Sequence, residues 1–100
     1  MKFLKLLAVA IMLLAVSAQA KTGQELFNKC EGCHGTTAQK KALGKSEIIQ
    51  GWDVNKTVKV LQGYKTGIYG GPMKGLMKGQ VISYSDKDIE NVAEYISSLK

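Results

Sequence analysis

Several residue types are scarce in this 100-residue sequence, which contains no arginine, one histidine, one proline and two cysteines. Nucleic-acid-binding surfaces usually combine a recognised motif with basic side chains that include arginine. The sequence has neither the motif nor the arginine, so nucleic acid is not an expected partner. A structural zinc site needs four ligands, and two cysteines with one histidine supply only three. Apolar runs are short as well, since residues 6–16 fall below the roughly 20 residues that span a bilayer.

Residues 1–20 have the pattern of a secretory signal peptide. A basic start with two lysines precedes the apolar run at 6–16, and a small-residue cleavage pattern ends at Ala20. We therefore predict export and a periplasmic mature protein of residues 21–100. An uncleaved membrane anchor is the alternative.

Residues 21–100 are expected to form one domain. They carry 12 lysines against 8 acidic residues, and such a basic surface suits docking to acidic partners. A chain this short forms only a marginal hydrophobic core. It usually needs an additional source of stability, such as a disulfide, a metal or a bound group.

The motif Cys30-Glu31-Gly32-Cys33-His34 contains every cysteine and histidine of the chain. The C-x-x-C-H spacing is typical of covalent haem c attachment. Two thiols at this spacing reach the two vinyl groups of one porphyrin edge, and His34 can then bind the iron. A thiol oxidoreductase with a Cys30–Cys33 disulfide is an alternative, but it needs a strand before the motif, and the preceding residues indicate helix. Zinc is a second alternative, and it lacks a fourth ligand.

Three amphipathic helices are predicted. Capping-box patterns at Thr22 and Ser85 open helices over about 23–33 and from 86 to the C-terminus, and Asp53 is the expected N-cap of a helix over 54–65. With no convincing strand pattern, the fold class is all-α, with three to four helices.

The segments between these helices are expected to pass close to the haem. Residues 36–45 are predicted to form a loop in which Leu43 contacts the haem and a carbonyl of 42–44 accepts a hydrogen bond from His34. Residues 46–50 suggest one short helical turn. Residues 66–84, rich in glycine, are predicted to be a loop over the second haem face. Trp52 is expected to be half-buried, with its indole N–H near a haem propionate as the functional alternative.

The second axial ligand of the iron is left open by these patterns. Methionine is the common partner of histidine in cytochromes c, and Met73 and Met77 are the only methionines outside residues 1–20. Lysine, tyrosine, the N-terminal amine or an open position are the remaining choices.

The chain resembles the small class I cytochromes c, and in particular the cytochrome c553 group of ε-proteobacterial type. The resemblance covers residues 21–100 and rests on the haem motif, Leu26-Phe27, Lys40-Lys41-Ala42-Leu43-Gly44-Lys45-Ser46, Tyr69-Gly70-Gly71 and Tyr84-Ser85-Asp86. Many class I members also have a proline soon after the haem motif, and this sequence has none there.

The resemblance implies a class I cytochrome c fold, in which helices wrap around one covalently attached haem c. It implies that Met77, with Val81 four residues later, is the second iron ligand. It also implies that the first and last helices cross near Gly23, Phe27 and Tyr95.

The expected function is electron transfer by a soluble, monomeric, periplasmic protein that is not an enzyme. Cys30 and Cys33 would hold the haem, and His34 and Met77 would bind its iron. Redox proteins with acidic docking patches are the expected partners, and a respiratory complex, an oxidase, a peroxidase or a dehydrogenase would fit. The candidate docking lysines are Lys40, Lys41, Lys45, Lys74 and Lys78. The alternative function is a haem c protein with an open or labile sixth position, which would bind a small ligand or act on peroxide.

Overall fold

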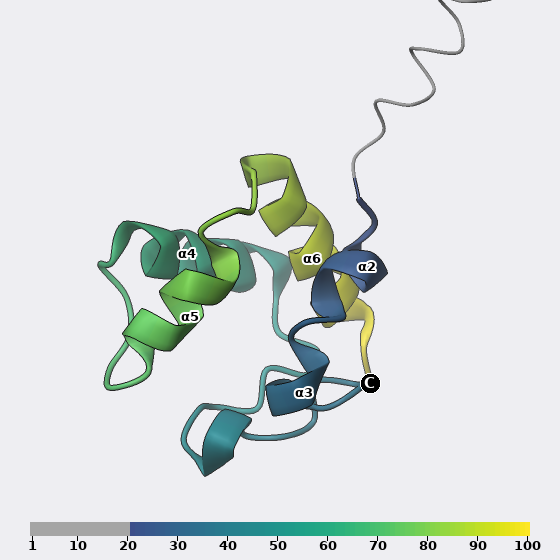
Figure 1. Ribbon diagram of the computed structural model, residues 1–100. Coiled ribbons are helices and arrows are strands. Elements are labelled where there is room, and N and C mark those ends of the chain that lie inside the picture. Colours follow the sequence, from purple (N-terminus) through teal and green to yellow (C-terminus); the bar gives the residue numbers. More distant parts are fainter. Residues whose placement is uncertain (1–20) are drawn as a thin grey trace, which may run out of the picture.

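The computed structural model describes residues 21–100, so the predicted signal peptide lies outside the described residues. The helices in this range are α2 (Gly23–Phe27), α3 (Glu31–His34), the 3₁₀ helix η1 (Ala42–Gly44), α4 (Val54–Thr66), α5 (Lys74–Val81) and α6 (Asp86–Ser98) (Figure 1). No residue in 21–100 is assigned to a strand, which confirms the predicted all-α class. Within the same range, no helix has the length and apolar character that crossing a membrane requires.

The predicted N-terminal capping signals are confirmed. Thr22 and Ser85 each form a reciprocal capping box, with Glu25 and Asp88 respectively, and the carboxylate of Asp53 accepts a hydrogen bond from the amide of Lys56. Each of these contacts joins residues three apart in sequence, so local chemistry alone determines where α2, α4 and α6 begin.

The single helix predicted over 23–33 is instead two helices, α2 and α3, separated by a turn at residues 28–30. The amide of Cys30 donates to the carbonyl of Phe27 at 2.8 Å, three residues back, whereas a continuing α-helix would direct it to Leu26. This tighter turn changes the direction of the chain between α2 and the haem motif. The amphipathic pattern was correct here, but the continuity of the helix was not.

The prediction that residues 66–84 form a loop is wrong, because α5 occupies Lys74–Val81. Its glycines at 75 and 79 weaken a helix by roughly 1 kcal/mol each, which is why the composition indicated a loop. Burial compensates this cost: Met77 and Val81, one turn apart, pack against the hydrophobic core. The helical turn predicted at 46–50 is also absent, and a 3₁₀ turn lies earlier, at Ala42–Gly44.

Helices α2 and α6 cross in close contact, as the resemblance implied. The rings of Phe27 and Tyr95 lie 5.6 Å apart between centroids. At Gly23, a Cβ atom would stand 2.3 Å from the carbonyl oxygen of Asn91 and 2.7 Å from Cβ of Tyr95. Only glycine allows the two backbones to approach this closely.

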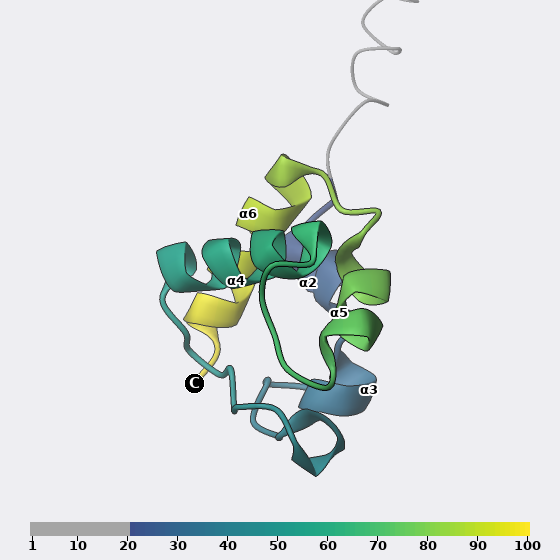
Figure 2. The same cartoon turned by 90° about the vertical axis from the view of Figure 1, so that its left-hand side faces the viewer.

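The second pair of packed helices is α4 with α5, and α6 contacts both α2 and α4. In both views, α3 and η1 lie below the α4–α5 pair (Figures 1 and 2). The buried core holds these parts together through Leu26, Phe27, Ala38, Leu61, Val81, Tyr84, Ile89, Val92 and Ile96. The chain therefore presents two walls, one from α3 and η1 and the other from α4 and α5.

Replacing Ser85 by alanine should lower the free energy of unfolding by about 1 kcal/mol, because it removes the side-chain acceptor for the amide of Asp88. Denaturant unfolding of the haem-loaded protein measures this change. Ser83→Ala, at an exposed position two residues earlier, is the matched control and should change stability by less than about 0.5 kcal/mol. Equal losses in both variants would contradict the capping role.

Candidate haem site

His34 is the last residue of α3, and its side chain is 6% exposed. Neither ring nitrogen has a hydrogen-bond partner among the described residues. Burial lowers the pKa of the imidazole, so the ring stays neutral at physiological pH. A buried polar group without a partner costs free energy, and a neutral imidazole with a free lone pair is a good iron ligand.

The expected hydrogen bond from His34 to a carbonyl of residues 42–44 is not formed in this structure. The loop is held to α3 through the backbone instead, since the amide of Lys40 donates to the carbonyl of His34 at 2.9 Å. Within η1, Leu43 has φ = +53°, an uncommon conformation for a branched side chain.

The two cysteines are free thiols in different surroundings. Cys33 is exposed, whereas Cys30 is half-buried against the hydrophobic core. Burial raises the pKa of the Cys30 thiol, and the nearby Lys29 opposes the shift. Within residues 21–100, no group of three His, Cys, Asp or Glu side chains could hold a metal ion, so the structure gives no support to the zinc alternative.

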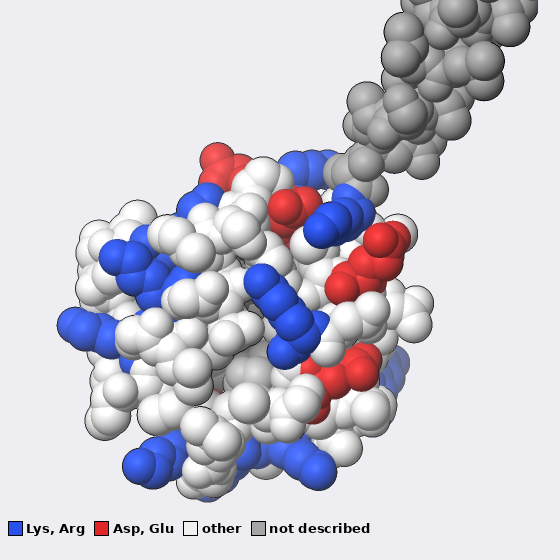
Figure 3. Space-filling model, in the orientation of Figure 1, with Lys and Arg blue, Asp and Glu red and all other residues white. Residues whose placement is uncertain are grey.

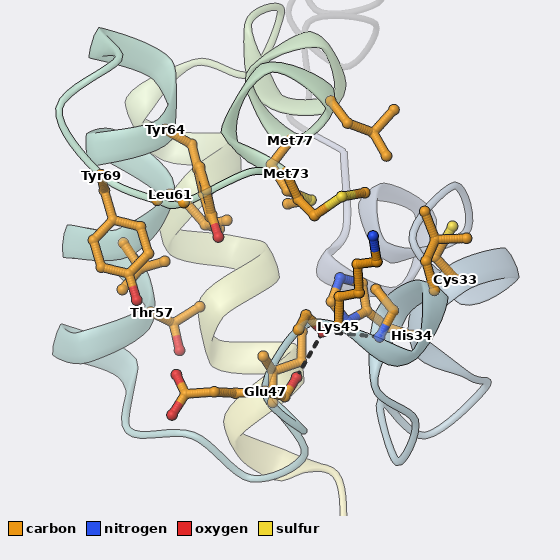
Figure 4. Close-up of a pocket in the computed structure, with 18 of the residues that line it drawn as sticks. Cys33, His34, Lys45, Glu47, Thr57, Leu61, Tyr64, Tyr69, Met73 and Met77 are labelled. Atoms are coloured by element: carbon orange, nitrogen blue, oxygen red, sulfur yellow. Dashed lines mark hydrogen bonds between the residues drawn. The ribbon is translucent and has the colours of Figure 1, made fainter.

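A cavity of about 280 Å³ opens between the two walls of the molecule (Figure 4). His34 and Cys33 line it on one side, and Met73, Leu76 and Met77 line it on the other. The remaining lining is largely apolar and comes from the 42–52 segment, α4, the turn before α5, and α6. The structure thus brings His34 and both candidate methionines to one cavity, whereas Cys30 is not among the residues that line it.

Leu43 and Trp52 both line this cavity. The predicted half-burial of Trp52 is confirmed, whereas contact of Leu43 with a haem stays a prediction. Leu43 is 60% exposed, so its side chain faces solvent as well as the cavity. The ammonium of Lys56 lies 3.9 Å from the ring centroid of Trp52, a cation–π contact that fixes the indole at the cavity.

Two cavity features were not predicted from the sequence. Tyr64 and Tyr69 pack edge to face, with centroids 5.1 Å apart, and form part of the α4 wall. Thr57 is buried in the same wall, and its hydroxyl donates to the carbonyl of Asp53 at 2.9 Å. Tyr64 lies in the helix predicted over 54–65, but nothing in the pattern indicates that Tyr69 folds back onto it.

These residues fit a haem. The cavity is mostly apolar, the buried imidazole at its edge has no other partner, and a thioether faces that imidazole from the opposite wall. Cys33 lines the same cavity, and Cys30 lies three residues before it, at the start of α3. An all-helical domain built in this way is a small haem c electron-transfer protein.

Comparison with known proteins identifies the family. The cytochrome c family model matches residues 20–100, and the chain belongs to the cytochrome c family. It is 37% identical to a cytochrome c-553 of Nitratidesulfovibrio vulgaris, over 83% of this chain and 81% of the relative. It is 34% identical to a cytochrome c-553 of Helicobacter pylori, over 95% of this chain and 96% of the relative. Membership implies one covalently bound haem c with its iron, and redox proteins as partners.

Gly70→Ala should destabilise the haem-loaded protein by about 2–4 kcal/mol. Gly70 has φ = +110°, and a Cβ there would lie 2.6 Å from Cε1 of Tyr64 and 2.8 Å from Cβ of Lys74. Backbone strain and overpacking each cost on the order of 1–3 kcal/mol. Denaturant unfolding followed by haem absorbance measures the loss.

The neighbouring residue supplies a matched control for this prediction. A Cβ at Gly71 meets nothing within 4 Å, and its φ is not in the left-handed region. Gly71→Ala should therefore change the free energy of unfolding by less than about 1 kcal/mol. Similar losses of stability in the two variants would show that the packing of Tyr64 against residue 70 does not require glycine there.

Proposed function

We propose that this protein is an exported, monomeric, single-haem electron carrier without catalytic activity of its own. Cys30 and Cys33 hold the haem covalently, and His34 and Met77 bind its iron from opposite sides. The observation that carries the proposal is the buried imidazole of His34, which has no partner and faces a methionine-lined apolar cavity.

Each residue has a defined task in this proposal. When bound, the haem supplies an iron that alternates between the ferric and ferrous states. His34 and Met77 keep the coordination closed in both states, so little rearranges during transfer, and the thioether favours the ferrous form. The apolar walls exclude water, and Leu43 covers part of the cavity from the η1 side.

Met77 is the proposed ligand rather than Met73 for two reasons. Met77 lies inside α5 and packs against the core cluster, which holds its position. Met73 stands at the N-terminal boundary of the helix, directly after Pro72. The spacing of Met77 to Val81 in the cytochrome c553 group supports the same choice.

The test is a visible spectrum of the protein from a host that attaches haem c, with and without carbon monoxide. We expect a low-spin reduced spectrum that the gas leaves unchanged. Met77→Ala should lose it and bind the gas, whereas Met73→Ala should retain it. The intact mass of the exported form should equal residues 21–100 plus one haem.

Two results would contradict the proposal. Immediate binding of carbon monoxide by the unmutated protein would mean an open sixth position and would support the ligand-binding alternative. Loss of the closed spectrum in Met73→Ala, with Met77→Ala unaffected, would reverse the assignment of the two methionines.

The charge distribution supports docking of acidic partners at the cavity side. Residues 54–85, which form α4, α5 and the turn between them, contain no acidic residue, and neither do residues 32–46. On the face drawn in Figure 3, acidic side chains lie toward α2, α3 and α6, with lysines among them, whereas the charged side chains over α4, α5 and η1 are lysines. The proposed docking lysines are all exposed, namely Lys40, Lys41, Lys45, Lys74 and Lys78.

Removing two of these charges should slow oxidation of the reduced protein by an anionic oxidant. With ferricyanide at low ionic strength, the Lys74→Gln/Lys78→Gln variant should react about two- to fivefold more slowly, since one charge near the contact contributes up to about 1 kcal/mol. Stopped-flow absorbance measures the rate, and added salt should narrow the difference.

Lys21→Gln/Lys87→Gln removes the same net charge and is the control, because Lys21 precedes α2 and Lys87 lies on α6, and neither residue lines the cavity. Lys87 lies on α6 and pairs with Glu90 at 3.6 Å. This variant should keep the unmutated rate within about twofold. Equal slowing in both double variants would indicate an effect of net charge, not of a docking surface.

A further inference from the structure

The carbonyl of Leu26 lies at the C-terminal end of α2, four residues before Cys30. A continuing helix would satisfy it with the amide of Cys30, but that amide donates to Phe27. The phenol hydroxyl of Tyr84, 58 residues later in the chain, donates to the Leu26 carbonyl instead, and Sγ of Cys30 lies 3.9 Å from the same oxygen. Tyr84 thus satisfies a helix-end carbonyl that the break between α2 and α3 leaves free.

Tyr84 is held in place on its other sides. Its side chain is buried, with the whole residue 5% exposed. Its amide donates to the carbonyl of Val81 at 2.9 Å, and its carbonyl accepts a hydrogen bond from the ammonium of Lys65 on α4. The ammonium of Lys29 lies 4.4 Å from the centre of the phenol ring. One residue therefore connects the end of α5 and α4 to the end of α2.

This connection joins the two segments that carry the proposed iron ligands. Met77 lies one helical turn before Val81, and Cys30 lies four residues after Leu26. The main helix contacts do not make this link, because α2 packs on α6 and α5 packs on α4. Movement of α5 as a unit away from α2 would disrupt the Tyr84–Leu26 hydrogen bond or the turn at Val81, in addition to the packing of Val81 in the core.

We propose that Tyr84 is a positioning residue that holds the Met77 segment against the haem-attachment segment and so limits opening of the bond between Met77 and iron. The inference rests on the proposed His34 and Met77 ligation. Haem attachment strengthens the dependence on Tyr84. Covalent attachment of a haem through Cys30 would form an S–C bond to one vinyl carbon and would transfer the thiol hydrogen to the other vinyl carbon. The sulfur then has no hydrogen to donate, and Tyr84 remains the side-chain donor to Leu26.

The test measures the rate at which cyanide binds to the ferric haem-loaded protein, because cyanide can bind only when the methionine leaves. Tyr84→Phe keeps the ring and removes the hydroxyl, leaving a buried carbonyl unpaired. We expect its resting spectrum to match that of the unmutated protein and cyanide to bind about tenfold faster. Small additions of denaturant should affect this rate only weakly, because the opening is local.

Tyr95→Phe is the matched control. It is the same substitution, and the Tyr95 ring packs on Phe27 outside the group formed by Tyr84, Leu26 and Cys30. Its cyanide-binding rate should stay within about twofold of the unmutated rate. If Tyr84→Phe yields no haem-loaded protein, Lys65→Met tests the same positioning role, because it removes the ammonium that donates to the Tyr84 carbonyl. Faster cyanide binding in Lys65→Met would support the role of Tyr84.

Other results would overturn the inference without affecting the proposed ligation. An unchanged cyanide-binding rate in Tyr84→Phe, or in Lys65→Met where that variant is needed, would show that the contacts of Tyr84 do not limit opening of the bond between Met77 and iron. A faster rate with the steep denaturant dependence of global unfolding would assign Tyr84 a purely structural role. Failure of the ligation itself is recognised separately, by immediate carbon monoxide binding to the unmutated protein.

Discussion

The buried imidazole of His34 is the constraint on which the rest of the structure depends. Burial removes the ring from water, and no described side chain or carbonyl replaces the lost hydrogen bonds. A buried polar group without a partner costs free energy, and a ligand that uses its lone pair would remove that cost. The apolar cavity beside it has the same requirement, because a chain of this size has too small a core to leave such a surface uncovered. In the cytochrome c family one group meets both requirements, since haem supplies an iron and a large apolar face.

The helices are arranged to serve the two sides of this cavity separately. Helix α2 crosses α6 through the close contact at Gly23 and leads directly into the haem motif. Helix α5 packs on α4 and carries Met77. This division lets each wall be built from mostly local contacts, but the relative position of the walls then depends on a few long-range contacts. The hydrogen bond between Tyr84 and Leu26 is one of them, which is why we assign it a role in keeping the iron coordination closed.

Charge follows the same division of the molecule. Helices α2 and α6 carry most of the acidic residues of 21–100. Asp86, Asp88 and Glu90 lie near the start of α6, where negative charge interacts favourably with the helix dipole. Two stretches that contribute to the cavity walls, residues 32–46 and 54–85, carry lysines and no acidic residue. A protein that must meet a partner briefly and release it gains from long-range attraction at the site of transfer, because such attraction raises the association rate more than the affinity.

The sequence by itself determined the haem motif, the all-α class and the starts of the three capped helices, because each depends on residues within a few positions of one another. The motif at 30–34 and the capping contacts of Thr22, Asp53 and Ser85 are of this kind. Recognition of the family, again from the sequence, indicated Met77 and the crossing at Gly23. Only the tertiary structure decided the features that oppose local preference. Helix α5 forms despite its glycines because Met77 and Val81 are buried against the core, and the helix before the motif breaks at residues 28–30. The phenol that satisfies the freed carbonyl comes from 58 residues away, a pairing that no periodicity or cap pattern encodes.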